Sequence, residues 1–550
     1  MVALDNLLGR GYLPKELHGA FGSMSYAKAM AKPAPVDFRS DKRWGQPSRH
    51  NLARPGLTSR VLAIPDPVHF YRLADVIASQ WSRIEAAIGR STMSLSKPVI
   101  DAKGVRALVP ALALRKIEAR AEHRARARYL IQVDVSQFYP SVYSHALDWA
   151  IRGKAAAKAS TRATAGLGPL LDLHTREGQD GQTIGIPIGP DSSLVLAELV
   201  LAQVDAELLA TGRSKGLHGF RYYDDYELYT RTRPDGEQAL ADIQRILGQW
   251  QLTANPYKIR IVELPEPVED EWISVLKKHQ LRDQRSQERA DINALFDESV
   301  RLARLYPREN VFAYALGKVI TRDLEERHQI QKGNWPHFEK LLLASALGEP
   351  GLISKVSCLL NWAKHRGWPL NSSIVADALT TVVVESASRG NWSEVAWAVW
   401  TSSCLAIPLP AEAGRAVSGT TDDVVALTAL DASSKGSLRG LKTTAWEQLM
   451  VGDSLRGEHW LLAYEALEHG WLPSKTSVDY ISADPIFSHL GLNNVRFYDD
   501  AAKLPPVSSG RSKARTGSTP RGPRLPAKAQ PPEPSEDQTE VAFELPDLYW

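Results

Sequence analysis

Three aspartates stand where their carboxylates could bind divalent metal ions. Asp224 and Asp225 are adjacent between two short β-type runs within residues 220–229, the pattern of a hairpin with two acids at its turn. Taken alone, an Asp-Asp turn is most often only a solvated turn. Asp134, however, lies at the end of the β-type run 129–135, and a buried strand that ends in a carboxylate needs a partner such as a cation.

Carboxylates that converge from separate strands are what in-line phosphoryl transfer requires. Two divalent ions about 4 Å apart can stabilise both the attacking and the leaving oxygen. Magnesium prefers such oxygen-only ligands. Asp134, Asp224 and Asp225 are therefore candidate catalytic and metal-binding residues, and Mg²⁺ is the expected cofactor.

The elements that must position these acids belong to a mixed segment. Between Val61 and about Leu276, short β-type runs alternate with longer segments of helical periodicity, which predicts one α+β domain. After about Asp283 the strand signals almost stop, and amphipathic helices follow one another, which predicts an all-α half. Gly-Asn-Trp stands between predicted helices at 333–335 and at 390–392. This hints at a HEAT-like helical-repeat array, with a plain helical bundle as the alternative.

Composition divides the chain into four predicted segments. Residues 1–57 are rich in Pro, Gly, Lys and Arg and form the expected irregular N-terminal arm. The α+β domain is expected over residues 58–282 and the α-helical domain over residues 283–503. Residues 504–550 are dense in Pro, Ser and Arg, which predicts a disordered basic tail because such a composition cannot bury enough apolar area. The tail ends in a partly apolar segment, 541–550, that is expected to dock on this subunit or on a neighbour.

Length and charge exclude several classes of protein. The chain has 550 residues, of which 43% are hydrophobic and 23% charged, so neither a mini-protein nor global disorder fits. The net charge of +3 leaves any attraction to nucleic acid to local basic patches, and the two Cys exclude a disulfide framework and a Cys-rich zinc site. No secretory signal is visible, and the most apolar long run, 194–210, contains Glu198, Asp205 and Glu207, which argues against a membrane span. A cytoplasmic location is expected.

Four motifs follow one another along the chain. They are Asp-Val-Ser-Gln-Phe-Tyr at 134–139, Gly-Ile-Pro-Ile-Gly-Pro-Asp-Ser-Ser at 185–193, Tyr-Tyr-Asp-Asp at 222–225 and Leu-Thr-Ala-Asn-Pro-Tyr-Lys at 252–258. Together they resemble the palm motifs of reverse transcriptases, in that family's order. The resemblance covers roughly residues 60–275 by motif. It implies a fingers-palm domain and an RNA-directed DNA polymerase, a nucleotidyltransferase that takes deoxynucleoside triphosphates.

The resemblance also implies roles for single residues in the first and fourth motifs. Val135 would join the metal site beside Asp134. Tyr139, five residues after the acid, would block a ribose 2′-hydroxyl and so favour deoxynucleotides. Lys258 would lie near the pyrophosphate and donate a proton to it, although a lone Lys is most often a surface charge.

In the second motif, Pro187, Ile188 and Gly189 would hold the template and the incoming base, since Gly and Pro let a backbone approach a base pair closely. Asp191 or Ser192 is expected to cap the helix that follows. Many reverse transcriptases have Gln where this chain has Ile188. An aliphatic side chain cannot make that polar contact beside the incoming nucleotide, which favours relaxed templating.

A basic cluster over residues 115–128 precedes the first motif, where polymerase fingers would put cations on the triphosphate. Arginine grips phosphate in a forked geometry, so Arg120, Arg124 and Arg126 are candidate nucleotide-binding residues. The alternative is a solvated helix face on which the neighbouring glutamates pair with these arginines.

The Ile-Pro-Ile-Gly-Pro variant, the run Phe-Tyr-Pro-Ser-Val-Tyr-Ser-His at 138–145 and the helical half together resemble the bacterial defence-associated class, which includes abortive-infection reverse transcriptases. The resemblance implies a role in antiviral defence. Either the enzyme copies a bound noncoding RNA, or it makes untemplated or protein-primed single-stranded DNA. A companion defence protein and a homo-oligomer are further candidate partners.

A magnesium-dependent DNA polymerase is thus the leading hypothesis. Its rival is a noncatalytic RNA-binding scaffold on a polymerase fold, which recruits an effector or oligomerises. The intact set of three acids argues against the scaffold, because an idle site has no reason to keep three like charges together. An RNA-dependent RNA polymerase is disfavoured by Tyr139.

Overall fold

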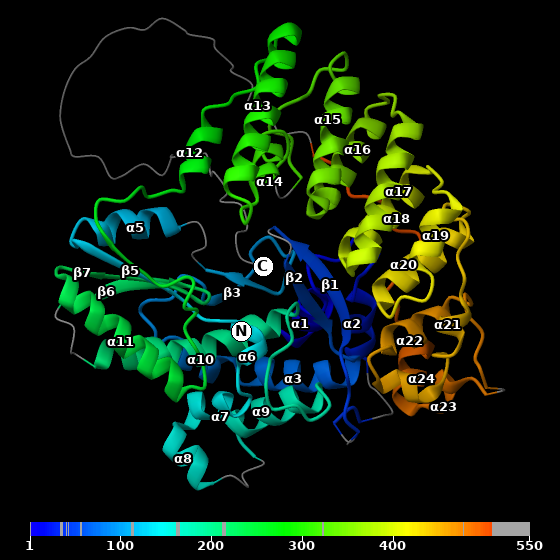
Figure 1. The fold of residues 1–550 in the computed structure, drawn as a ribbon. Helices are drawn as coiled ribbons and strands as arrows, with labels where there is room; N and C mark the ends of the chain where they lie inside the picture. The colour runs from blue at the N-terminus through cyan, green and yellow to red at the C-terminus, as the bar shows by residue number, and fades with distance from the viewer. Residues whose placement is uncertain are drawn as a thin grey trace, which may run out of the picture.

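The computed structural model describes residues 2–32, 37–39, 41, 43–55, 58–111, 115–160, 165–211, 216–321, 324–476 and 478–508. The predicted tail, with its docking segment 541–550, lies outside the described residues except for residues 504–508. The expected fold class is confirmed, since an α+β region with a small antiparallel sheet is followed by a long run of helices (Figure 1).

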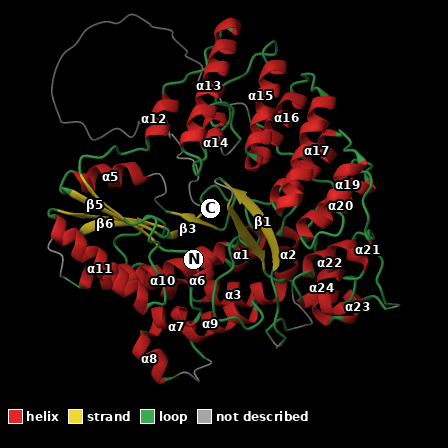
Figure 2. Ribbon diagram, viewed as in Figure 1, coloured by secondary structure: helices red, strands yellow, loops and turns green. Residues whose placement is uncertain are grey.

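A four-stranded antiparallel sheet of order β6–β7–β5–β8 forms the centre of the α+β region (Figure 2). Its strands are β5 (Tyr129–Asp134), β6 (His218–Tyr222), β7 (Asp225–Thr230) and β8 (Arg260–Glu263). Asp134 at the end of β5 lies opposite Asp225 at the start of β7. This register brings the first and third motifs to the same end of the sheet.

Helices cover both faces of this sheet. On one face lie α10 (Asp191–Ala210) and α11 (Arg233–Gln249), and α11 packs directly on β5 and β7 (Figure 1). Helix α10 is buried on almost every side, which explains why it is apolar around its whole circumference. Helix α5 (Lys116–Arg124) packs against β6 from the other face.

The N-terminal segment contributes to the same core as the rest of the chain. It contains α1 (Leu4–Arg10), α2 (Met24–Met30) and the antiparallel hairpin of β1 (Ser48–Arg54) and β2 (Thr58–Ile64), which is not predicted from the sequence. Leu7, Tyr12 and Tyr26 are fully buried. The remaining elements before the helical half are α3 (Pro67–Ser79), α4 (Trp81–Ile88), β3 (Pro98–Ile100), β4 (Leu108–Pro110), α6 (Phe138–Ser141), α7 (His145–Arg152), α8 (Lys154–Ala159) and α9 (Leu167–Glu177).

The second half consists of helices stacked in two layers. Helix α15 packs on α17 and α17 on α19, while α16 packs on α18, α18 on α20 and α20 on α22, as expected of a helical-repeat domain. The helices of this half are α12 (Glu271–Lys277), α13 (Arg285–Leu305), α14 (Val311–Leu316), α15 (Trp335–Gly348), α16 (Ile353–His365), α17 (Ser372–Arg389), α18 (Trp392–Leu405), α19 (Ala411–Val417), α20 (Asp423–Ser434), α21 (Thr444–Glu447), α22 (Trp460–Glu468), α23 (Tyr480–Ala483) and α24 (Pro485–Leu492), with 3₁₀ turns η2 (Pro350–Leu352) and η3 (Gly452–Arg456).

The two Gly-Asn-Trp motifs do not mark the repeat itself. Asn334 precedes α15 and Asn391 precedes α18, each as the N-cap residue of its helix. These two helices belong to different layers of the stack. The motif therefore marks a way of starting a helix, and Gly390 before the second one ends α17 in a left-handed conformation.

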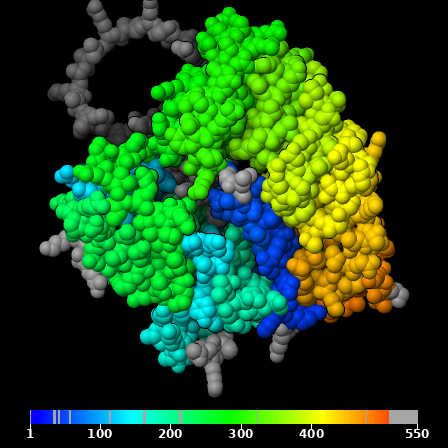
Figure 3. All heavy atoms as spheres, viewed as in Figure 1, coloured from blue at the N-terminus to red at the C-terminus, as the bar shows by residue number. Residues whose placement is uncertain are grey.

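The helical half returns to the N-terminal segment and closes the molecule into a ring-like shape (Figure 3). Helices α18 and α20 pack against β1, and the His50 ring lies 2.9 Å from a carboxylate oxygen of Asp422. The indole of Trp460 donates a hydrogen bond to the carbonyl of Ile64 at 2.9 Å. Among the described residues, no helix is both long and apolar enough to cross a bilayer.

One buried charge cluster joins α10 to the sheet. The guanidinium of Arg221 on β6 lies 2.8 Å from Glu198 and 2.9 Å from Asp205, and none of the three residues is accessible to solvent. Burial opposes the charge of Arg221, but Asp205 and Glu198 outweigh it and raise the pKa of Arg221. Hydroxyls of Ser94 and Ser96 also donate to Glu198, both at 2.8 Å. The carboxylates of Glu198 and Asp205 therefore both have buried partners.

We expect Arg221→Met to lower the free energy of unfolding of this region by about 3–5 kcal/mol, because two buried carboxylates would lose their cation. Chemical denaturation of the full chain measures the change. The control is Arg233→Met, which breaks an exposed pair with Glu237 on α11 and should cost at most about 1 kcal/mol. Equal effects of the two substitutions would show that the buried cluster is not a structural centre.

Candidate active site

The turn between β6 and β7 carries one of the acids and is held in a strained conformation. Its loop residues are Tyr223 and Asp224. Tyr223 has a φ of +54°, in the left-handed region that is unfavourable for a residue with a β-carbon. Arg221 Nη1 donates to the Tyr223 carbonyl at 2.7 Å, and the Tyr223 N–H donates to Ser96 Oγ at 2.8 Å. These bonds hold the turn, and with it the position of Asp224.

Asp134 lies beside this turn at the end of β5. The N–H of Val135 donates to the Asp224 carbonyl at 3.2 Å, so the backbones of the first and third motifs are in direct contact. The Asp134 carboxylate accepts hydrogen bonds from Lys258 Nζ at 2.7 Å and from Asn255 Nδ2 at 3.1 Å. The fold thereby brings together predicted site residues from three separate motifs.

Burial and like charge both oppose ionisation of the two acids near the turn. Burial and the Asp134 carboxylate raise the pKa of Asp224. Burial and Asp224 raise the pKa of Asp225 in the same way, against the attraction of Lys116. Oδ2 of Asp225 is buried and has no hydrogen-bond partner among the described residues. The site therefore has acceptor capacity that its own side chains leave unused.

A divalent cation fits this imbalance, because carboxylate oxygens are its preferred ligands. The described part of the chain has no group of three or more His, Cys, Asp or Glu side chains already arranged to hold a metal ion. Lys258 Nζ, which lies 2.7 Å from Asp134 Oδ2, contacts an oxygen that a metal ion would use. A metal ion at Asp134 would compete with Lys258 for this carboxylate.

Tyr139, the candidate gate residue, lies in α6, five residues after Asp134. Its hydroxyl is buried, and burial together with the negative charge of Asp224 raises the pKa of Tyr139. Its backbone carbonyl accepts a hydrogen bond from the N–H of Ile186 at 2.9 Å. The side chain thus lies close to the acids, and the backbone is bound to the second motif.

The second motif is anchored from the N-terminal segment, which the sequence did not indicate. The N–H of Ala63 in β2 donates to the Ile188 carbonyl at 2.8 Å. Gly189 has a φ of +135°, and a β-carbon there would lie 2.5 Å from Pro14 Cγ. The Pro187 carbonyl accepts a hydrogen bond from a serine hydroxyl of α10. The glycine is therefore required both by its backbone conformation and by the close approach of the arm.

The expectation that Asp191 or Ser192 caps α10 was wrong. The helix begins at Asp191 itself, its N-cap residue is Pro190, and no side chain makes a capping bond. The Asp191 carboxylate instead accepts hydrogen bonds from Arg106 and from the backbone N–H groups of residues 107–108. A tertiary ion pair uses the oxygen atoms that a cap would need.

The structure gives the three predicted arginines other partners. Arg120 forms a two-pronged bond with Glu227 of β7, with a shortest distance of 2.7 Å. Arg124 donates to the carbonyls of residues 266–267 at 2.7 Å. Arg126 lies in the turn after α5, is exposed, and is 3.9 Å from Glu122 of that helix. Arg120 and Arg124 tie α5 to the rest of the domain, and neither is directed at the acids.

Two other cations act on the acids electrostatically. Burial lowers the pKa of Lys116, at the start of α5, and the negative charge of Asp225 opposes this effect. Burial and the nearby Arg54 lower the pKa of Arg60 in β2, while Asp224 opposes them. Lys116 belongs to the basic cluster that the sequence shows. Arg60 lies in a segment without any motif, and no sequence signal pointed to it.

Comparison with known proteins identifies the domain that carries this site. Residues 83–287 match the family model described as reverse transcriptase (RNA-dependent DNA polymerase). No curated protein matches the chain at a significant level.

Solved structures also match, at low identity. An apo telomerase from Candida tropicalis is 11% identical with a TM-score of 0.31, over 73% of this chain and 71% of that chain. A telomerase from Candida albicans in complex with a TWJ fragment of telomeric RNA is 13% identical with a TM-score of 0.27, over 68% of this chain and 69% of that one.

A Candida tropicalis telomerase truncated from its C-terminal domain is 12% identical with a TM-score of 0.29, and the match covers 41% of this chain and about half, 51%, of that one. The family match is the finding that bears on chemistry. This chain contains, over residues 83–287, a reverse transcriptase domain, which is an RNA-directed DNA polymerase and nucleotidyltransferase domain.

Proposed function

We propose that the protein is a magnesium-dependent DNA polymerase of the reverse-transcriptase class, which adds deoxynucleotides to a growing DNA 3′ end. The proposal rests on the convergence of Asp134, Asp224 and Asp225 at one end of the sheet, with a buried Asp225 oxygen that lacks a hydrogen-bond partner among the described residues. Two divalent ions held by such carboxylates stabilise the attacking and leaving oxygens. Val135 would contribute its backbone carbonyl, because its side chain is apolar.

In this reaction the DNA 3′-hydroxyl attacks the α-phosphorus of a deoxynucleoside triphosphate, and the bond to pyrophosphate breaks. Asp134 and Asp224 are the proposed principal ligands of the ions, and Asp225 assists them. Lys258, whose ammonium lies 2.7 Å from Asp134, is the proposed proton donor to the leaving pyrophosphate. Binding of a cation by Asp134 would free this ammonium.

Other residues select and orient the nucleotide. Tyr139 is the proposed gate against a ribose 2′-hydroxyl, and Pro187, Ile188 and Gly189 would support the template and the incoming base. The aliphatic side chain of Ile188 supports relaxed templating, because it cannot make a polar contact there.

Lys116 and Arg60 are better placed for the triphosphate than Arg120 and Arg124, whose guanidiniums are bound to other protein groups. Both preferred cations act electrostatically on the acids that would hold the metal ions. A guanidinium such as that of Arg60 suits a phosphate because it presents parallel donors.

The proposed biological role is antiviral defence in the bacterial cytoplasm, supported by the resemblance of the second motif and of the helical half to defence-associated reverse transcriptases. The proposed partners are deoxynucleoside triphosphates and nucleic acid, as a noncoding RNA template, a DNA product or both. A companion defence protein and a homo-oligomer belong to the same proposal.

Magnesium binding can be tested by thermal unfolding, without a measurement of polymerase activity. In EDTA, Asp224→Asn/Asp225→Asn should raise the unfolding temperature, because it removes buried like charges. Added Mg²⁺ should then raise the unfolding temperature of the wild type only, since an ion at ten times its dissociation constant stabilises by about 1.4 kcal/mol. Asp499→Asn/Asp500→Asn, in an exposed acid pair, is the matched control and should behave as wild type. A similar Mg²⁺ response in the double palm variant would refute the metal assignment.

The gate assignment predicts a change in sugar selectivity. Tyr139→Ala should reduce the ratio of kcat/KM for a deoxynucleotide over the matching ribonucleotide by at least about tenfold, because the ring no longer fills the space of the 2′-hydroxyl. Tyr139→Phe keeps the ring and should keep the ratio. Single-nucleotide incorporation kinetics measure both variants, and an unchanged ratio in the Ala variant would contradict the assignment.

The activity itself is tested on the protein purified with its accompanying nucleic acid. Each deoxynucleotide is added singly and together with Mg²⁺, with and without prior ribonuclease treatment, beside Asp224→Asn/Asp225→Asn. Product from one nucleotide that survives ribonuclease means untemplated synthesis, and product that requires bound RNA means copying. If wild type makes no more product than the double variant, the polymerase proposal fails and the RNA-binding scaffold takes its place.

A further inference from the structure

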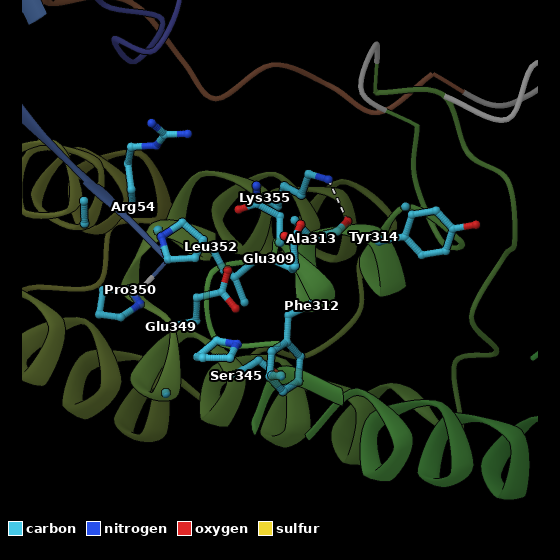
Figure 4. Close-up of a pocket in the computed structure, with 18 of the residues that line it drawn as sticks. Arg54, Glu309, Phe312, Ala313, Tyr314, Ser345, Glu349, Pro350, Leu352 and Lys355 are labelled. Carbon is cyan, nitrogen blue, oxygen red and sulfur yellow. Dashed lines mark hydrogen bonds between the residues drawn. The ribbon is translucent and has the colours of Figure 1, made fainter. Parts of the chain in front are cut away.

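A second site lies outside the acids, in a cavity of about 850 Å³ between the β1–β2 hairpin and the helical half (Figure 4). Its walls are the hairpin residues around Arg54, helix α14, the C-terminal end of α15, and η2. None of the three palm aspartates lines it. Volumes of this order are typical of cavities that enclose a small organic ligand.

The walls of this cavity carry far more positive than negative charge. Two acids, Glu309 and Glu349, face a larger number of basic side chains. The basic residues are Arg54, Arg304, Lys318, Arg327, Lys355 and Arg389. Such an excess favours an anionic ligand, because arginine and lysine bind phosphate oxygens through charge-assisted hydrogen bonds.

The two acids offer hydrogen-bonding groups to a ligand. Oε2 of Glu309 is buried without a hydrogen-bond partner among the described residues. Burial raises the pKa of Glu349 to about 7, so near neutral pH its carboxyl can donate as well as accept a hydrogen bond. Groups of this kind can read the polar edge of a heterocyclic base.

Apolar surface completes the cavity. Phe312 and Leu352 lie on its walls together with Leu52 of the hairpin. Lys355 is oriented by a 2.8 Å hydrogen bond to the Ala313 carbonyl (Figure 4). A ligand that uses every part of this lining needs a planar apolar body, polar edges and a charged phosphate group. A nucleotide has all three.

We propose that this cavity binds one free nucleotide, with its phosphates on basic side chains of the walls, Arg304 among them, and its base against the apolar and glutamate part of the lining. The cavity borders the palm, because Lys116 and Lys258 act electrostatically on Glu309, but none of the three palm aspartates lines it. Occupancy of the cavity does not require the proposed polymerase reaction. The hairpin of β1 and β2 forms one wall of the cavity, and Ala63 of β2 donates a hydrogen bond to Ile188. A bound nucleotide would therefore also stabilise the position of the second motif.

The test measures binding of labelled dATP, and separately of ATP, to the full chain by equilibrium dialysis in EDTA, in the Asp224→Asn/Asp225→Asn background. Metal-dependent binding at the palm is absent under these conditions. We expect one nucleotide per chain. Arg304→Glu should weaken its binding by about tenfold or more, as expected for the loss of a charged hydrogen bond. Arg289→Glu, an exposed position on the same helix that does not line the cavity, is the control and should have no effect.

Three results would overturn the proposal. They are a lack of binding in EDTA, binding that is unchanged by Arg304→Glu, and equally tight competition by inorganic pyrophosphate, which would leave only an anion site. A single-stranded dT₁₀ oligonucleotide that binds in an Arg304-dependent way while mononucleotides do not would assign the cavity to a nucleic acid strand. Failure of polymerase activity alone would leave this binding result intact.

Discussion

The position of the turn that carries Asp224 depends on one buried guanidinium. Arg221 neutralises Glu198 and Asp205 of α10 and also holds the carbonyl of Tyr223, the strained residue next to Asp224. A buried ion pair stabilises little by itself, but it is costly to break from one side. The cluster therefore ties α10 to the hairpin, and with it the position of Asp224.

The β1–β2 hairpin is a second constraint, and it connects the two halves of the molecule. On one side it holds the second motif through the bond from Ala63 to Ile188, and on the other side His50 pairs with Asp422 of the helical half. The helical half is thus in direct contact with the hairpin that holds the second motif. A displacement of α18 or α20 would be transmitted through the hairpin to the backbone of the second motif.

The sequence predicted where the acids lie, at a strand end and in a hairpin turn, because these signals are local. A β-type run that ends in Asp134 and a hairpin with Asp224 at its turn are readable within ten residues. The partners of Arg221 are not, since Glu198 and Asp205 appear in the sequence only as charges that interrupt an apolar run. Their meaning emerges when α10 packs against the sheet.

Tertiary partners are also missing from the prediction for the arginine cluster. The sequence of a helix does not show that Arg120 has Glu227 as its partner. The negative charge of the acids is instead partly balanced by Lys258 of the fourth motif, Lys116 of α5 and Arg60 of β2. These cations come from three elements far apart in the chain. The electrostatic balance of the site therefore depends on the tertiary fold. If any one of these three segments were removed, the repulsion between the buried carboxylates would be less compensated by positive charge.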